Sequence, residues 1–195
     1  MPIADTRWIR RTTIAARGFG LIELVITIAV LAVLTTIALP SFNSTIRSNR
    51  VSTQANDLLS AIQLARSEAV ARSRGVSVCA ADTGAGVPAA CGSDWGQGWI
   101  AFVDDLAMTA PATAPTNVDA DNILKVWTAD SQATFTADTD YIRFSPHGQS
   151  MQNGAGVTGD ATLAIVPGSG CSGDQQRIIE VNAMGRAKSR RDSCP

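Results

Sequence analysis

The stretch GFGLIELVITIAVLAVLTTIALP, residues 18–40, decides how this chain is organised. Residues 19–39 form a run of twenty-one residues that is almost entirely apolar, with one carboxylate, Glu23. About 20 apolar residues at 1.5 Å each span a bilayer core of roughly 30 Å. A secretory signal peptide has a shorter apolar core, of about 7 to 15 residues. The run therefore predicts a membrane-spanning helix over residues 19–39.

The residues on either side of the run predict its orientation. The first 18 residues carry a net charge of +3, and the remainder of the chain carries −4. Positively charged segments stay on the cytoplasmic side of a membrane. We therefore expect a single-pass protein with a cytoplasmic segment at residues 1–18. Everything after Pro40 is expected outside the inner membrane.

Glu23 raises a second question, because a charge inside hydrocarbon costs kilocalories per mole. It lies four residues after Phe19, which is one helical turn. If the chain is cut between Gly18 and Phe19, the new α-amine of one copy can pair with Glu23 of a neighbour in an apolar bundle. The alternative is that the Glu23 side chain extends to the lipid headgroups. The residues alone leave both interpretations open.

The segment RGFGLIELVITIAVLAVL, residues 17–34, resembles the processing and assembly segment of type IV pilins and pseudopilins. The resemblance implies that a prepilin peptidase cuts after Gly18 and methylates Phe19, and that Glu23 serves docking in the growing filament. Gly20 departs from the family, which more often has threonine there. The resemblance also implies a bacterial inner-membrane protein whose outer domain is first periplasmic and then extracellular in a pilus. Other pilin subunits are its expected partners.

The sequence after Pro40 predicts that the helix continues and packs on a globular domain. Pro40 lacks an N–H group and is expected to kink or locally melt the helix. Apolar residues then recur at helical spacing, and Gly75 is the expected C-terminal stop. We therefore expect one helix from about Phe19 to Arg74. Its outer half, residues 40–75, presents an apolar stripe to the domain.

From residue 76 onward the sequence changes to short alternating runs separated by turns. Alternation and β-branched residues favour strands, whereas stretches rich in Gly, Pro, Ser, Thr and Asp favour loops. We therefore expect an α+β, pilin-like fold: a long N-terminal helix, membrane-spanning in its first half, packed on an antiparallel β domain over residues 76–195. The expected strands cover residues 76–80, 98–104, 122–127, 140–145, 161–167 and 177–184.

The four cysteines predict disulfides, because an even number outside the cytoplasm favours oxidation. Their order and spacing suggest Cys79 with Cys91 and Cys171 with Cys194, and two other pairings remain open. The chain has one histidine, His147, and no pair of cysteines has CxxC spacing, which disfavours zinc. We therefore expect no metal site and no cofactor.

Three segments of the β domain resemble the GspH/FimT group of pilin-like proteins. In that group a tryptophan-rich cluster opens a core strand, so we expect Trp95 and Trp99 in the core. The group includes a pseudopilin of type II secretion and minor pilins of type IV pili. The three segments are CGSDWGQGWIAFVDD (residues 91–105), IRFSPHG (142–148) and RIIEVNAMGRAKSRR (177–191).

The residue types argue against an enzyme. With one histidine, no free cysteine expected, no paired acidic motif and no glycine-rich phosphate loop beside a helix, no catalytic constellation is apparent. We interpret Asp104 and Asp105 as the end of a strand, and His147 as an exposed loop residue.

The basic residues of the β domain gather near the C-terminus. If Cys171 and Cys194 are joined, we expect GRAKSRR, residues 185–191, to form a pinned, protruding loop. Such a cluster of cations can collect phosphates, and without aromatic neighbours it would bind a nucleic-acid backbone with little sequence preference. Five of the seven basic residues after Gly75 lie in this region: Arg177, Arg186, Lys188, Arg190 and Arg191.

The tail also resembles the glycine-arginine-any-arginine motif of FimT minor pilins, which is tied there to DNA capture in natural transformation. Gly185 and Arg186 match, and Lys188 stands where the second arginine is usual, which keeps the charge but loses the bidentate fork. The resemblance implies a minor type IV pilin that binds extracellular double-stranded DNA. The alternative is a structural subunit, either a tip-priming minor pilin or a type II secretion pseudopilin. In that case the tail is a solvated charge run or a contact with a neighbouring subunit.

Overall fold

The computed structural model describes residues 18–82, 90–105, 107, 114–115, 118–151 and 160–195. The chain divides into two compact units, Met1–Ser41 and Phe42–Pro195. Of the expected cytoplasmic segment, residues 1–18, only Gly18 is among the described residues. Helix α1, Leu21–Arg72, contributes to both units. It remains helical at Pro40, so the expected local melting is not observed.

In the first unit, α1 carries apolar side chains on all sides. Its large apolar side chains from Leu21 to Leu34 are each more than half exposed in the single chain. Among the described residues, no helix has the length and apolar character needed to cross a membrane.

Helix α1 ends in a hydrogen-bonded cap. Ser73 has a φ of 53°, and its N–H donates to the carbonyl of Val70 at 3.3 Å. The N–H of Arg74 donates to the carbonyl of Ala69 at 3.2 Å, which completes a Schellman motif. The left-handed residue of this stop is therefore Ser73, and not the expected Gly75.

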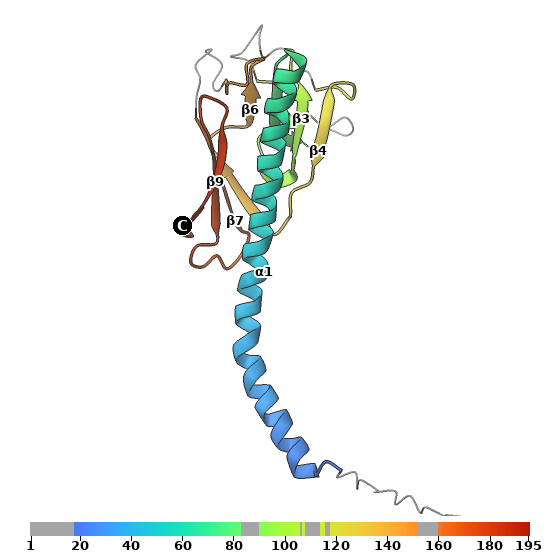
Figure 1. Ribbon diagram of the computed structural model, residues 1–195, viewed down its shortest axis with the longest axis vertical. Coiled ribbons are helices and arrows are strands. Elements are labelled where there is room, and N and C mark those ends of the chain that lie inside the picture. The colour runs from blue at the N-terminus through green and yellow to red at the C-terminus, as the bar shows by residue number, and fades with distance from the viewer. Residues whose placement is uncertain (1–17, 83–89, 106, 108–113, 116–117, 152–159) are drawn as a thin grey trace, which may run out of the picture. The chain divides into compact units, whose positions relative to one another are not determined.

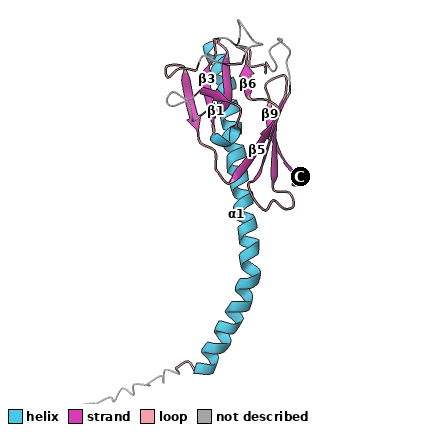
Figure 2. Ribbon diagram, turned by 180° about the vertical axis from the view of Figure 1, so that it is seen from behind, coloured by secondary structure: helices cyan, strands magenta, loops and turns pink. Residues whose placement is uncertain are grey.

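Two antiparallel sheets make up the β part of the second unit (Figures 1 and 2). One has the strand order β2-β1-β3-β4, with β6 also paired to β1, and the other has the order β5-β7-β8-β9. A short 3₁₀ helix, η2 (Trp95–Gln97), precedes β3. The strands are β1 (Val76–Asp82), β2 (Ala90–Gly92), β3 (Trp99–Val103), β4 (Ile123–Trp127), β5 (Ala133–Ala137), β6 (Tyr141–Phe144), β7 (Ala161–Pro167), β8 (Gln176–Val181) and β9 (Ala187–Asp192).

The α+β fold expected from the sequence is confirmed. Each of the six expected strands is present, as β1, β3, β4, β6, β7 and β8. Strands β2, β5 and β9 are additional, and β9 is the one that changes the functional argument.

The main core lies between α1 and one face of each sheet. Leu58 and Ile62 of α1 pack with Trp99 and Ile165 in one buried cluster, where all four side chains are at most 1% exposed. The Trp99 ring also lies 5.8 Å from that of Phe135, centroid to centroid. Full burial of an aliphatic side chain such as Leu58 or Ile62 stabilises the fold by about 1.5 to 3 kcal/mol. Trp99 is thus a core residue, as expected, and so is Trp95, which is 3% exposed.

The opposite face of the first sheet is covered by a smaller apolar cluster. Cys79, Ile100 and Phe102 are fully buried there, and Cys91 packs against them. The Cys79–Cys91 disulfide lies in this cluster, with the two Cα atoms 5.6 Å apart. The second disulfide joins Cys171 and Cys194, so both suggested pairs are present.

A fully buried ion pair joins β6 to the end of β3. Asp104 follows β3, as expected for the end of a strand, but its carboxylate is 0% exposed, as is the Arg143 side chain. One oxygen, Oδ2, accepts from Nε of Arg143 at 2.8 Å and lies 2.7 Å from Nη2. The same oxygen accepts from Oγ of Ser77 in β1 at 2.6 Å. The pair therefore links three strands of one sheet.

Candidate nucleic-acid interface

The basic tail forms a strand and not the expected protruding loop. Strand β9 pairs antiparallel with β8 along its whole length and forms an edge of the second sheet. Ala187, its first residue, packs against the main core. Backbone pairing and this contact order the segment, even though four of its six residues are exposed. Charged side chains, especially lysine, are typical of edge strands because they discourage pairing with other chains.

A tight turn connects β8 to β9 and presents Arg186. The N–H of Gly185 donates to the carbonyl of Asn182 at 2.7 Å, and the N–H of Asn182 donates to the carbonyl of Arg186 at 3.0 Å. The Asn182 side chain also accepts from the Arg186 N–H at 2.9 Å. Gly185 has a φ of 74°, which is the left-handed position of a three-residue hairpin loop.

Arg66 of α1 holds this turn in place. Its Nε donates to the carbonyl of Gly148 at 3.0 Å, and its Nη2 donates to the carbonyl of Met184 at 3.1 Å. The β8–β9 turn and the turn after β6 are packed so closely that a Cβ at Gly185 would lie 2.0 Å from the Gly148 oxygen. Gly185 is therefore required for packing as well as for its backbone angle, and the position of Arg186 depends on it.

We expect Gly185→Ala to destabilise the second unit by about 2 to 3 kcal/mol, from a left-handed backbone angle and a steric clash together. Gly173→Ala is the matched control: Gly173 has a φ of 61° but nothing within 4 Å of its Cβ position. Gly173→Ala should therefore lower the stability only by the cost of the left-handed backbone angle, about 1 kcal/mol. Chemical denaturation of both variants measures the difference. Equal losses would show that the contact with Gly148 is unimportant.

The strand determines which of the basic side chains in GRAKSRR lie on the same face, which the sequence alone does not show. Side chains two residues apart in a strand share a face, so Lys188 and Arg190 lie on one side of β9, about 6.6 Å apart along the chain. Arg186 lies in the turn directly before β9 and borders the same surface depression as Lys188. Arg191 lies on the opposite side of β9. We call Arg186, Lys188 and Arg190 the cation row. Arg186 and Lys188 border a surface depression of about 600 Å³. The described residues that line it include no aromatic side chain: they are Asp160, Thr162, Glu180, Val181, Asn182, Arg186 and Lys188.

Carboxylates of the same hairpin neutralise part of the cation row. Glu180 lies opposite Lys188 in the strand register, with its Oε2 2.8 Å from the Lys188 Nζ and its Oε1 3.0 Å from Nε of Arg190. Arg190 also contacts Asp192 at 2.6 Å. Hydrogen bonds from Lys188 and then Arg190 lower the pKa of Glu180, and the bond from Arg190 lowers that of Asp192. Arg186 forms no ion pair within the described chain.

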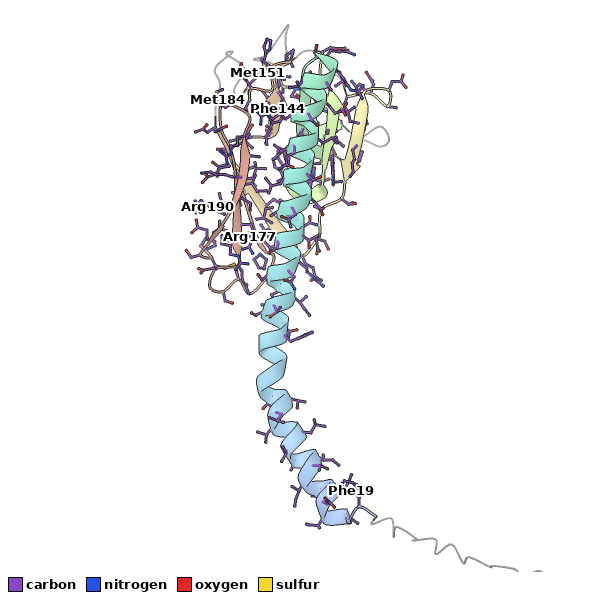
Figure 3. The ribbon with its side chains drawn as sticks, viewed as in Figure 1. Phe19, Phe144, Met151, Arg177, Met184 and Arg190 are labelled. Atoms are coloured by element: carbon purple, nitrogen blue, oxygen red, sulfur yellow. A yellow bond between two sulfur atoms is a disulfide. The ribbon has the colours of Figure 1, made fainter. Side chains whose placement is uncertain are left out.

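The structure removes Arg177 from the predicted interface. Its side chain lies beside α1, whereas Arg190 lies at the outer margin of the domain (Figure 3). Arg177 is 6% exposed, and its Nη2 donates to Oγ of Ser52 at 2.8 Å. Burial lowers its pKa, and the positive charge of Arg191 across the strand pair adds to this effect. Arg177 therefore serves the contact between α1 and β8.

The predicted processing and assembly residues lie at the start of α1 in the first unit. Phe19 is 80% exposed, and Figure 3 labels it beside the start of the helix. The N–H of Glu23 donates to the carbonyl of Gly20 at 3.1 Å, which places Glu23 in the first turn of the helix. A carboxylate there interacts favourably with the helix dipole. Cleavage after Gly18 and the pairing of Glu23 with a neighbouring copy remain predictions.

No group of three or more His, Cys, Asp or Glu side chains in the described chain is placed to hold a metal ion. His147 is exposed in the turn after β6, where its N–H donates to Oγ of Ser145 at 3.3 Å.

Comparison with known protein families gives two matches. Residues 54–185 match the family described as type II transport protein GspH. Residues 15–39 match the prokaryotic N-terminal methylation motif, and this range includes Gly18, Phe19 and Glu23. No curated protein matches the chain.

Comparison with solved structures gives the type IV minor pilin FimU of Pseudomonas aeruginosa in two crystal forms. The first is 20% identical, with a TM-score of 0.52, and the match covers 73% of this chain and 89% of that chain. The second is also 20% identical, with a TM-score of 0.50 and coverage of 71% and 91%. The likeness at this identity concerns the fold.

Proposed function

Because this chain belongs to the GspH family, we propose that it is a minor type IV pilin that binds extracellular double-stranded DNA through the cation row, for uptake in natural transformation. The methylation motif and the shared fold support a pilin-like subunit. The observation that supports DNA binding is the exposure of Lys188 and Arg190 on one side of the ordered strand β9, with Arg186 exposed in the turn directly before it.

The chemistry of the row suits a phosphate backbone. Arginine and lysine make charge-assisted hydrogen bonds to phosphate oxygens, and the strand fixes their spacing before the ligand arrives. Among the described residues that line the depression beside the row, none is an aromatic on which a base could stack. Contacts to phosphates position a protein on DNA but carry no sequence information directly. The proposed binding is therefore independent of base sequence.

The proposal includes the route by which the domain reaches DNA. A prepilin peptidase would cut after Gly18 and methylate Phe19, and Glu23 would then guide assembly with other pilin subunits. The segment around these residues would be anchored at the bacterial inner membrane, with the second unit in the periplasm and later on the pilus. The two disulfides suit that location, because they persist in the periplasm and outside the cell.

One observation favours the alternative, a structural subunit of a pilus tip or of a type II secretion system. Lys188 and Arg190 are already paired with Glu180 and Asp192, which leaves Arg186 as the one cation of the row without an ion pair in the described chain. A largely neutral strand can serve as a contact with a neighbouring subunit. The two candidate functions differ in whether the isolated protein binds a duplex.

Fluorescence anisotropy with a labelled duplex and the full chain in non-ionic detergent tests DNA binding. With about three phosphate contacts, log K should fall with log salt at a slope of about −3. Arg186→Gln should flatten the slope by about one unit. Replacing all three row residues with glutamine should bring the slope close to zero. Duplexes of scrambled sequence should bind equally well.

Arg191→Gln is the matched control for this experiment, because it removes the same charge from the opposite side of β9. It should change the salt slope much less than Arg186→Gln. All these variants should keep the wild-type Tm, since exposed charges contribute little to folding. Unchanged binding by the triple variant would refute the cation row as the site. No binding by the wild type, even at low salt, would favour the structural subunit.

A further inference from the structure

Glu180 bridges two cations of the cation row. Its two carboxylate oxygens are divided between two cations, with Oε2 at 2.8 Å from the Lys188 Nζ and Oε1 at 3.0 Å from Nε of Arg190. The strand register fixes this arrangement, because Glu180 of β8 is the direct cross-strand partner of Lys188 in β9. Glu180 is 30% exposed, so a ligand that reaches the two cations also meets the carboxylate.

We propose that Glu180 is an internal counterion that competes with phosphate for Lys188 and Arg190, and thereby restricts the cation row to polyanions. This inference rests on the proposed function of the same row. A ligand that offers many phosphates at once can displace Glu180, whereas a single phosphate cannot.

The physical reason is the difference between tethered and free competitors. A group attached to the same hairpin competes at an effective concentration in the millimolar range or above, however dilute the protein is. A free phosphate must exceed that concentration to replace the carboxylate. A duplex meets the same competition with many linked phosphates. Its first contact, with Arg186, which has no ion pair within the described residues, makes the later contacts intramolecular. Glu180 would therefore lower the affinity for every anion but would exclude only the small ones.

The isosteric substitution Glu180→Gln tests this inference in the same anisotropy assay. It keeps the side-chain shape and removes the competing charge. The affinity for the duplex should rise about 2- to 30-fold, which corresponds to relieving competition from two exposed ion pairs. Inorganic phosphate, added at constant ionic strength, should displace duplex from the Glu180→Gln protein but not from the wild type.

Glu68→Gln is the matched control. Glu68 pairs with Arg72 on α1 at 2.6 Å and is 29% exposed, so this variant makes the same change in net charge at a site outside the hairpin. Its affinity for DNA should stay close to that of the wild type, and so should its response to phosphate. A rise as large as that of Glu180→Gln would show that net charge alone acts, and would overturn the inference.

The failure of this inference can be told apart from the failure of the proposed function. If the wild type binds DNA, the triple glutamine variant does not, and Glu180→Gln binds no more tightly than the wild type, the counterion role is wrong and the DNA site stands. If the wild type does not bind DNA at all, both are wrong.

Discussion

Asp104→Asn is expected to destabilise the second unit by about 3 to 5 kcal/mol, because it leaves the charge of Arg143 buried without its carboxylate. Both side chains of this pair are 0% exposed. For a domain of this size, the loss corresponds to a fall in Tm of about 10 °C or more. Thermal unfolding followed by circular dichroism measures it. Asparagine preserves the side-chain shape, so the effect reports the charge and not a cavity.

Two further variants make this prediction specific. Glu68→Gln breaks an exposed ion pair and should cost about 0.5 kcal/mol or less. Replacing Asp104 with leucine and Arg143 with methionine together removes both charges and should recover much of the stability that the single substitution loses. If Asp104→Asn unfolds at the same temperature as Glu68→Gln, the buried pair contributes little to stability.

Glu23→Ala is expected to abolish incorporation into pili while leaving cleavage after Gly18 intact. On the proposed route the peptidase would act on the segment before Phe19, whereas the carboxylate would be needed afterwards to pair with the amine of a neighbouring Phe19. Loss of one charge would leave that amine without a partner in an apolar bundle, which is strongly unfavourable. N-terminal sequencing measures cleavage, and immunoblotting of sheared pili measures incorporation.

Thr27→Ala provides the control for Glu23→Ala. Thr27 lies one turn further along α1, and its hydroxyl donates to the carbonyl of Leu24 within the helix at 2.7 Å. Its loss removes a polar group but no charge, so incorporation should be normal. Normal incorporation of Glu23→Ala would show that Glu23 is not required for docking. An uncut leader in the presence of an active peptidase would contradict the predicted cleavage site.

Periodicity was enough to predict the helix and most of the sheet. The apolar stripe of α1 and the alternating runs of β7 and β8 are patterns that only a regular element buries, and they led to the correct fold class. The order of the cysteines led to the correct disulfides. In each case the signal lies within a short stretch of sequence.

Strand β9 could not be predicted in the same way, because it has almost no apolar signal. Its order depends on hydrogen bonds to β8 and on the contact of Ala187 with the core, and both are properties of the folded hairpin. Predicted as a loop, residues 185–191 offered four equivalent cations, with Arg177 in the strand before them. In the structure Arg177 is buried in β8, Arg191 is on the other side of β9, and the remaining three form the cation row.

The ion pairs of the site were equally inaccessible from the sequence. Glu180 and Lys188 are eight residues apart, which is too far for their side chains to form an ion pair within a single strand or a helix. They meet because the turn at Gly185 sets the register of the hairpin. The same holds for Asp104 and Arg143, which meet because β3 and β6 both pair with β1. Sequence patterns predict well which residues are buried. They predict which side chains pair with each other only when the two residues are close in the sequence.

Strand β9 is held to α1 near both of its ends. This would affect how the hairpin resists a pulling force, such as the force on a DNA-bound pilin when a pilus retracts. At one end Arg66 holds the turn through Met184, and at the other the Cys171–Cys194 disulfide ties the strand to a loop that Arg47 holds through Gly170 at 3.0 Å. A strand fastened at one end peels away one hydrogen bond at a time. A strand fastened at both ends must break its bonds together, so a pull on the cation row is resisted by the whole hairpin and passed to the helix.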